Sequence, residues 1–308
     1  MRWRSHVVDC TLRAIRALPE PAAWWLGGML GHWYAHWVGR DVGRCRRHLT
    51  LAFPERDRAW VRDCARRCFA HFGRMGLWTV ATLHRPSLQQ SHRVPLEGGK
   101  NFLATAAELR RGSGVLVVSG HLGNWELLAR CTGAVVPITV LGRRLRYPEL
   151  DRLIIAARSD GGRNRVIFQD QGMAACLREL RQGRIMATLP DQDVGRLAGC
   201  FVPFFGRPAY TPLGPALMAV MTRRPVQPVY CLLRNGRWVF HWGPQLWPDL
   251  RLDRQAAAVA LTARFTAYQE RIIRQLPWQW VWWHKRWRHA PADKPDAPVV
   301  QGPTDPQP

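Results

Sequence analysis

The central part of the chain alternates between short apolar runs and amphipathic segments. β-Branched runs such as residues 114–119 ("GVLVVS") and 184–189 ("RIMATL") are typical of buried strands. The segments between them repeat apolar residues three or four positions apart, as one face of a helix does. Further strands are expected at 135–142 and 164–168, with helices near 124–131, 148–158 and 173–183. This alternation predicts an α/β fold with a single mixed sheet covered by helices.

The remaining part of the chain continues the pattern and then loses it. Residues 226–233 and 237–243 flank an Asn-Gly pair, which predicts a β-hairpin. A long helix is expected from about Asp253 until Pro277 ends it. The proline-rich, polar residues 291–308 are expected to be disordered, so we assign the α/β domain to residues 96–290.

Residues 1–95 read as a helical N-terminal extension. The best marked helix has Val61, Cys64, Cys68, Phe72 and Met75 on one stripe. Four arginines avoid that stripe, so the helix has a basic face: Arg62, Arg66, Arg67 and Arg74. This face is either an ordinary solvated surface or a contact to an anionic bilayer.

Residues 21–38 form a tryptophan-rich stretch of eighteen uncharged residues. This length is at the short limit for a membrane span, and His32 and His36 make it a poor one. A core helix and a genuine span remain alternatives. We favour anchoring at the membrane interface, because indole rings concentrate there.

The composition narrows the classes of partner. The formal net charge is +23, and only Lys100, Lys285 and Lys294 of the 45 basic residues are lysine. Such a surface suits anionic partners: nucleic acid, anionic lipid, a phosphorylated substrate or an acidic carrier protein. Sixteen tryptophans favour a membrane interface. The eight cysteines include no CxxC pair, which is typical of a reducing cytoplasm and gives no metal-binding spacing.

The segment "SGHLGNWE", residues 119–126, carries candidate chemistry. His121 is expected in the loop after a strand, Asn124 at the N-cap of the next helix, and Glu126 in its first turn. There Glu126 can accept a proton from one ring nitrogen and leave the other basic toward a substrate. The alternative is a capped helix with an incidental surface histidine.

Two further segments follow strands. Asp191 and Gln192 come directly after the strand at 184–189, and Phe204, Phe205 and Gly206 lie in "FVPFFGRPA". Ligands in open α/β sheets gather beyond the carboxyl ends of strands, which makes these residues candidates for substrate binding. Asp191 alone also suits a turn, and the two phenylalanines suit either a core or the wall of an apolar groove.

Five blocks resemble one known family, in that family's order: "LAFPE", "SGHLGNWE", "LPDQ", "VPFFGRPA" and "LPWQWVWWHKRW". They are similar to the motifs of the bacterial lipid A late acyltransferases. These are the lauroyl and myristoyl transferase branch of the lysophospholipid acyltransferase superfamily. The resemblance spans about residues 1–290 and implies a glycerol-3-phosphate acyltransferase-like fold.

The resemblance also implies an activity and a place. The expected reaction moves a fatty acyl chain from an acyl carrier protein thioester to a hydroxyl of a lipid A precursor. The expected site is the cytoplasmic face of a Gram-negative inner membrane rich in anionic lipids. No cofactor or metal is implied. The resemblance makes His121 the general base and Glu126 its partner. The substrate-binding candidates are Asn124, Arg143, Arg158, Asp191, Gln192, Phe204, Phe205 and Gly206.

Some features leave alternatives open. His48 stands where the family commonly has asparagine, and Trp278 stands where a glutamate commonly follows the proline. An ornithine lipid, an aryl polyene precursor or a glycolipid therefore remains an alternative acceptor. No GxSxG nucleophile elbow is present, which favours direct attack over an acyl-enzyme. Backbone amides at 120–123 or a nearby arginine are the alternatives for stabilising the oxyanion. A non-enzymatic nucleic-acid binder is the rival from another class.

Overall fold

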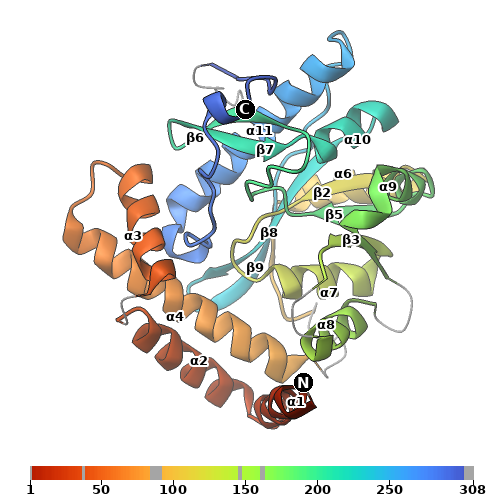
Figure 1. Ribbon diagram of the computed structural model, residues 1–308. Helices are drawn as coiled ribbons and strands as arrows, with labels where there is room; N and C mark the ends of the chain where they lie inside the picture. The colour runs from red at the N-terminus through yellow and green to blue at the C-terminus, as the bar shows by residue number, and fades with distance from the viewer. Residues whose placement is uncertain (1, 37–38, 84–91, 145–147, 160–163, 302–308) are drawn as a thin grey trace.

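The computed structural model describes residues 2–36, 39–83, 92–144, 148–159 and 164–301. A sheet of seven strands lies at its centre in the order β1-β9-β8-β2-β5-β3-β4 (Figure 1). Neighbouring strands run parallel except β8 and β9, which form an antiparallel hairpin. The strands are β1 (Leu96–Glu97), β2 (Val115–Val118), β3 (Ile138–Gly142), β4 (Arg165–Phe168), β5 (Ile185–Thr188), β8 (Val226–Arg234) and β9 (Arg237–Trp242).

Helices cover both faces of this sheet, which confirms the mixed α/β architecture predicted from the alternation. One face packs against α6 (Gly99–Arg110) and α7 (Trp125–Val135). The other packs against α9 (Gly172–Arg181), α10 (Gly214–Thr222) and α11 (Arg254–Gln275). Helix α8 (Pro148–Ser159) contacts α7 and β4. Strand β2 is buried on both faces, as its apolar run predicted.

Local sequence signals explain where several elements begin and turn. The Asn124 side chain accepts a hydrogen bond from the Leu127 amide at 3.0 Å and caps α7. Asp253 caps α11 in the same way. The β8–β9 turn places Asn235 and Gly236 at positive φ, the backbone that such a two-residue hairpin turn requires.

Four helices form one side of the molecule (Figure 1): α1 (Arg2–Arg16), α2 (Glu20–Tyr34), α3 (Arg40–Ala52) and α4 (Arg58–Thr82). Helices α2 and α4 approach closely because glycines face one another. A Cβ added at Gly27 would lie 2.3 Å from the carbonyl oxygen of Gly73. The predicted apolar stripe of α4 packs into a core that also contains residues of β8 and α11. The helical region and the sheet therefore share a hydrophobic core.

Helix α2 buries its small residues and exposes large apolar ones. Trp25 is 67% exposed, Trp33 63% and Leu30 50%. Among the described residues, no helix combines the length and the apolar character needed to cross a bilayer. Residues 37–38 of the expected anchor lie outside the described part. Anchoring at the membrane interface stays a prediction.

One C-terminal segment differs from the sequence expectation. Residues 291–301 were expected to be disordered, but Val299 pairs with Phe201 and the Phe201 amide donates to Pro298 at 2.7 Å. This contact gives the proline-rich segment a strand to lie against; residues 302–308 are outside the described part. The segment "WQWVWWHKRW" is largely interior, with Trp280 and Trp282 fully buried.

A small second sheet was missed as an element. Strands β6 (Gly199–Phe204) and β7 (Arg207–Pro212) form an antiparallel hairpin. Its turn places Phe205 and Gly206 at φ of +52° and +70°. A phenylalanine rarely adopts this backbone, so the sequence carried no strong turn signal there.

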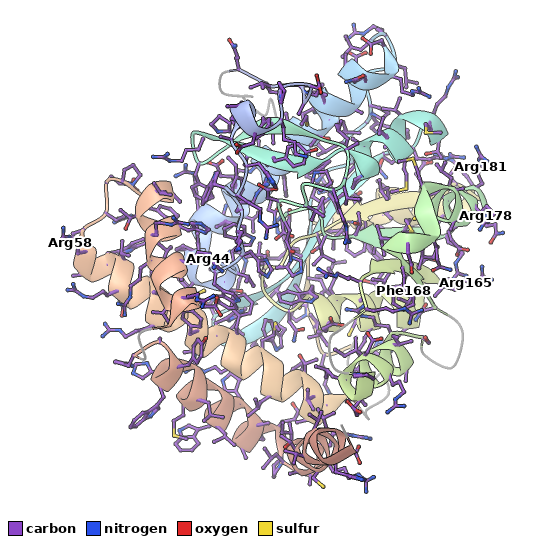
Figure 2. The ribbon with its side chains drawn as sticks, in the orientation of Figure 1. Arg44, Arg58, Arg165, Phe168, Arg178 and Arg181 are labelled. Atoms are coloured by element: carbon purple, nitrogen blue, oxygen red, sulfur yellow. The ribbon has the colours of Figure 1, made fainter. Side chains whose placement is uncertain are left out.

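The arginines are spread over the surface. Arg58 lies at one side of the molecule, while Arg178 and Arg181 lie at the opposite side (Figure 2). All three are exposed. These arginines therefore place positive charge on opposite sides of the molecule.

Candidate active site

Two neighbouring parallel strands bring the candidate residues together. Strand β2 ends beside β5, with Val118 aligned to Thr188. The Ser119 amide extends this pairing by donating to the Thr188 carbonyl at 2.9 Å. The loops that follow the two strands therefore meet, and they carry His121 and Asp191.

His121 is held by Asp191. Its Nδ1 lies 2.8 Å from one carboxylate oxygen, and its backbone amide donates to the other oxygen at 2.7 Å. The Trp280 indole N–H donates to that second oxygen at 2.9 Å. With Asp191 as the acceptor, Nδ1 carries the proton and Nε2 is the basic nitrogen.

The charge of Asp191 is stabilised within the fold. Its side chain is fully buried, and burial alone raises the pKa of a carboxyl group. The charge and hydrogen bond of His121 outweigh burial, with smaller contributions from His284 and Trp280, so the pKa of Asp191 lies well below its usual range. Asp191 is therefore an anion in direct contact with the His121 ring.

Glycines allow this close arrangement. A Cβ at Gly120 would lie 1.9 Å from Nε2 of Gln269, a residue that also reaches Asp191. Gly123 has φ of +63°, and its amide donates to the Gln279 carbonyl at 2.8 Å. The amides of residues 121 and 123 are thus already used in hydrogen bonds, which removes them as the expected oxyanion donors.

Glu126 has a different partner from the one expected. Both of its carboxylate oxygens accept hydrogen bonds from Arg158, at 2.9 and 2.5 Å. Burial opposes the charge of Arg158, but Glu126 outweighs it and raises the pKa of the guanidinium. The predicted contact between Glu126 and the imidazole is therefore corrected: Asp191 takes that position. Glu126, on α7, instead forms a bidentate ion pair with Arg158 of the neighbouring helix α8.

Polar and aromatic groups surround the imidazole. The Gln192 amide nitrogen lies 3.2 Å from Nε2. The rings of Trp125 and His284 lie 5.1 and 4.7 Å from the His121 ring, centroid to centroid. Burial, with the nearby charge of His121, lowers the pKa of His284 to about 4. His284 is therefore neutral near pH 7 and adds no second positive charge beside a protonated His121.

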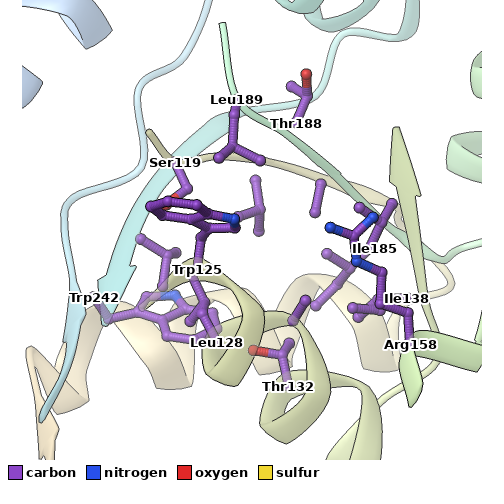
Figure 3. Close-up of a pocket in the computed structure, with 15 residues that line it drawn as sticks. Ser119, Trp125, Leu128, Thr132, Ile138, Arg158, Ile185, Thr188, Leu189 and Trp242 are labelled. Carbon is purple, nitrogen blue, oxygen red and sulfur yellow. The ribbon is translucent and has the colours of Figure 1, made fainter. Parts of the chain in front are cut away.

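An apolar cavity of about 40 Å³ lies next to the site, between α7 and the sheet (Figure 3). Trp125 and Arg158 border it, and Figure 3 shows the Arg158 guanidinium reaching into it. The rest of the lining is mainly aliphatic and comes from five strands, the ends of two of them, and α7. Among the described residues of this lining, Arg158 is the only charged one, and its ion pair with Glu126 holds it in place.

The remaining candidates lie away from the imidazole. Asn124 is fully buried and caps α7 while contacting Thr79. Arg143 is exposed after the carboxyl end of β3. Phe204 and Phe205 pack in the core rather than on an open groove wall, and Gly206 lies in the hairpin turn.

Three residues of the site were not singled out from the sequence: Gln269, Trp280 and His284. Trp280 and His284 belong to "LPWQWVWWHKRW", so that motif gave a signal without indicating a role. Gln269 lies on a buried position of α11 and gave none. The described residues contain no group of three or more His, Cys, Asp or Glu side chains placed to hold a metal ion.

The fold and the site define an α/β protein with a histidine–aspartate pair at the carboxyl ends of central parallel strands. The chain matches the bacterial lipid A biosynthesis acyltransferases over residues 1–289 and belongs to that family. It is 25% identical over 298 residues to the lipid A biosynthesis lauroyltransferase of Escherichia coli (strain K12). That match covers 95% of this chain and 94% of that protein.

A second kind of relative acts on another lipid. The chain is 32% identical over 197 residues to the phosphatidylinositol mannoside acyltransferase of Mycobacterium tuberculosis (strain CDC 1551 / Oshkosh). That match covers 59% of this chain and 57% of that protein. It is also 25% identical over 190 residues to a palmitoleoyltransferase of Escherichia coli lipid A biosynthesis, covering 61% and 60%. The protein is therefore an acyltransferase of the lipid A biosynthesis type.

Proposed function

We propose that the protein transfers a fatty acyl chain from an acyl carrier protein thioester to a hydroxyl of a lipid A precursor. The observation that carries the proposal is His121, oriented by buried Asp191 and packed against Trp125, which lines an apolar cavity. This pairing supplies a general base, and the cavity gives the start of a site for a hydrocarbon chain.

The proposed reaction is a direct attack. The acceptor hydroxyl gives its proton to Nε2 of His121 as its oxygen bonds to the thioester carbonyl carbon. Asp191 stabilises the imidazolium that forms. The tetrahedral intermediate then breaks its carbon–sulfur bond, and the departing thiolate takes the proton from His121. The Gln192 amide, 3.2 Å from Nε2, lies where the hydroxyl must approach and is therefore expected to move aside.

The acyl chain is proposed to enter the cavity between α7 and the sheet. Its volume of about 40 Å³ is small beside the roughly 150 Å³ cavity that accepts benzene in another protein. A fatty chain therefore needs movement of bordering side chains. Trp125 and the Glu126–Arg158 pair lie at that border and are the groups we expect to move or to mark the entrance.

We further propose that the enzyme works at the cytoplasmic face of the inner membrane. The exposed Trp25, Leu30 and Trp33 of α2 support insertion into the interfacial region of a bilayer. The net charge of +23 supports attraction to anionic lipids, to phosphates of the acceptor and to an acidic carrier protein.

A glycolipid acceptor is the second candidate. It is favoured by the 32% identity to an acyltransferase named for phosphatidylinositol mannoside. Both acceptors would present a hydroxyl to the same base, so the chemistry at His121 is unchanged.

The mass spectrum of lipid A tests the proposal. Cells lacking the gene are compared with cells rescued by the wild type or by His121→Ala. We expect one acyl increment to disappear on deletion, to return with the wild type and to stay absent with His121→Ala. An unchanged lipid A spectrum would move the acceptor to the glycolipids. Full rescue by His121→Ala would exclude the histidine as the base.

A further inference from the structure

A second recess lies on the helical side of the molecule. It is a groove of about 390 Å³ between α2, α4 and the segment that follows α11. Its polar and aromatic lining includes His32, Arg66, Arg67, His71, Arg74 and Trp278. The described residues that line it include none of those lining the apolar cavity beside His121. The groove is therefore a separate site.

The groove concentrates positive charge and holds it in place. The Arg67 guanidinium lies 3.7 Å from the centre of the Trp278 ring. Arg74 lies over Gly28, where an added Cβ would be 2.5 Å from its Nε. Asp63 is the acidic residue of the lining and contacts Arg66 at 3.4 Å and Arg67 at 4.0 Å. Three arginines thus face one carboxylate, which leaves an excess of positive charge.

His71 is an independent sign of a polar ligand. It lines the groove, yet its side chain is almost fully buried, with only 2% of the residue exposed. Neither ring nitrogen has a hydrogen-bond partner in the described part of the chain. Buried polar groups are normally hydrogen-bonded. A ligand that accepts or donates a hydrogen bond at His71 would supply the partner that the described residues do not.

The border of the groove indicates what kind of molecule carries the ligand. His32 lines the groove, and Trp25 and Met29 lie on the same side of α2 by helical spacing. Trp25 and Trp33 are more than 60% exposed. A basic recess beside exposed tryptophans suits an amphiphile, with its headgroup in the recess and its chains along α2.

We propose that this groove binds the phosphate of a lipid headgroup. Arg67 and Arg74 would hold the phosphate oxygens through charge-assisted hydrogen bonds, and His71 would hydrogen-bond a phosphate oxygen or hydroxyl from below. The phosphate belongs either to the lipid acceptor or to a phospholipid of the bilayer. The acceptor alternative rests on the proposed function, whereas binding of a bilayer phospholipid does not.

Vesicle binding tests the groove without any transfer reaction. Phosphatidylcholine vesicles carry phosphatidic acid, or phosphatidylglycerol at equal surface charge. The groove variant carries both Arg67→Gln and Arg74→Gln. The control variant carries both Arg58→Gln and Arg62→Gln. The control pair removes the same charge from exposed positions of α4 outside the groove. We expect the groove variant to lose about tenfold or more in affinity for phosphatidic acid beyond the control.

Equal losses in the two double variants would overturn the proposal, because net charge alone would then explain binding. His71→Phe adds a test at constant formal charge. It keeps a ring of similar size and is expected to weaken phosphatidic acid binding, which a purely electrostatic surface does not predict. Thermal unfolding checks that each variant remains folded.

Transfer assays in uncharged detergent micelles distinguish the two sources of phosphate. If the groove holds the acceptor, its variants raise KM for the phosphorylated acceptor, leave kcat unchanged, and have no effect with a dephosphorylated acceptor. If it holds a bilayer phospholipid, vesicle binding falls while this KM stays constant. A rise in KM for the acyl carrier protein with unchanged vesicle binding would make the groove a protein-docking surface and overturn the proposal.

Discussion

Two carboxylates near His121 stand in different electrostatic situations. Asp191 contacts an imidazole that takes up a proton in the proposed reaction, so its negative charge is available to stabilise the protonated ring. Glu126 faces Arg158, which is charged throughout, so its negative charge is already matched. The charge of the Asp191–His121 pair changes when the imidazole gains a proton, which suits catalysis. The charge of the Glu126–Arg158 pair stays constant, which suits holding α7 against α8.

Substituting each carboxylate by its amide separates these roles. Asp191→Asn removes the acceptor that keeps the proton on Nδ1, and we expect kcat to fall by about 10²–10⁴-fold. Glu126→Gln leaves a largely buried Arg158 without its partner. We expect this change to lower the free energy of unfolding by about 3–5 kcal/mol. Steady-state kinetics and urea unfolding measure the two effects.

A paired substitution controls for the unpaired charge. Glu126→Leu combined with Arg158→Met removes both charges, and we expect its stability to recover relative to Glu126→Gln. If Glu126→Gln instead keeps native stability and loses as much kcat as Asp191→Asn, then Glu126 acts on the base, as the sequence pattern alone suggested.

At the level of elements, the sequence predicted what depends on nearby residues. The Asn124 cap, the Asn-Gly hairpin and most elements between 114 and 275 are each set by residues within a few positions, and they were predicted correctly: β2, β3, β4, β5, β8, β9, α7, α8, α9 and α11. The sequence analysis did not predict β6, β7 or α10. The pairing of His121 with Asp191 joins residues seventy positions apart and depends on β2 and β5 being neighbours. Sequence spacing pointed to Glu126 instead, because strand order is not visible in a local pattern.

Helix α7 also sets the size of the apolar cavity, through Leu128, Ala129 and Thr132. Ala129→Leu places extra carbons in a space of about 40 Å³. We expect the variant to prefer donors with shorter acyl chains, because each methylene excluded from an apolar site loses about 0.8 kcal/mol. Competition between acyl carrier protein thioesters of different chain length measures the preference.

Ala104→Leu is the matched control, because it makes the same change at an exposed position of α6. Its chain-length preference should equal that of the wild type. An unchanged preference in Ala129→Leu, with the protein folded, would place the acyl chain outside this cavity.

On the scale of the whole molecule, the helical side and the sheet are joined by a core that buries several histidines. The Nδ1 atom of buried His48 lies 2.8 Å from the Trp282 carbonyl oxygen. His71 packs against aromatic rings of α4 and β9. Burial lowers the pKa of His48 to about 4, of His71 to about 3 and of His284 to about 4. All three are neutral at pH 7 in the folded protein.

These histidines predict a loss of stability in mild acid. In the unfolded chain a histidine has a pKa of about 6.5, so as the pH falls below that value the unfolded state binds protons that the folded state does not. Each of the three then lowers the free energy of unfolding by about 1.4 kcal/mol per pH unit, between about pH 6 and pH 4.5. Above pH 7 they contribute no pH dependence. Urea unfolding at successive pH values measures this slope.

The contribution of one histidine can be isolated. His71→Phe removes one titrating group from the core, so its slope should be smaller than that of the wild type by about 1.4 kcal/mol per pH unit. His92→Gln removes an exposed histidine and should leave the slope unchanged. An equal slope in His71→Phe and the wild type would mean that His71 binds a proton in the folded state, which requires a partner for its ring. In that case a group in the groove on the helical side would accept a hydrogen bond from His71. Vesicles carrying phosphatidic acid should then change the pH dependence of the free energy of unfolding further.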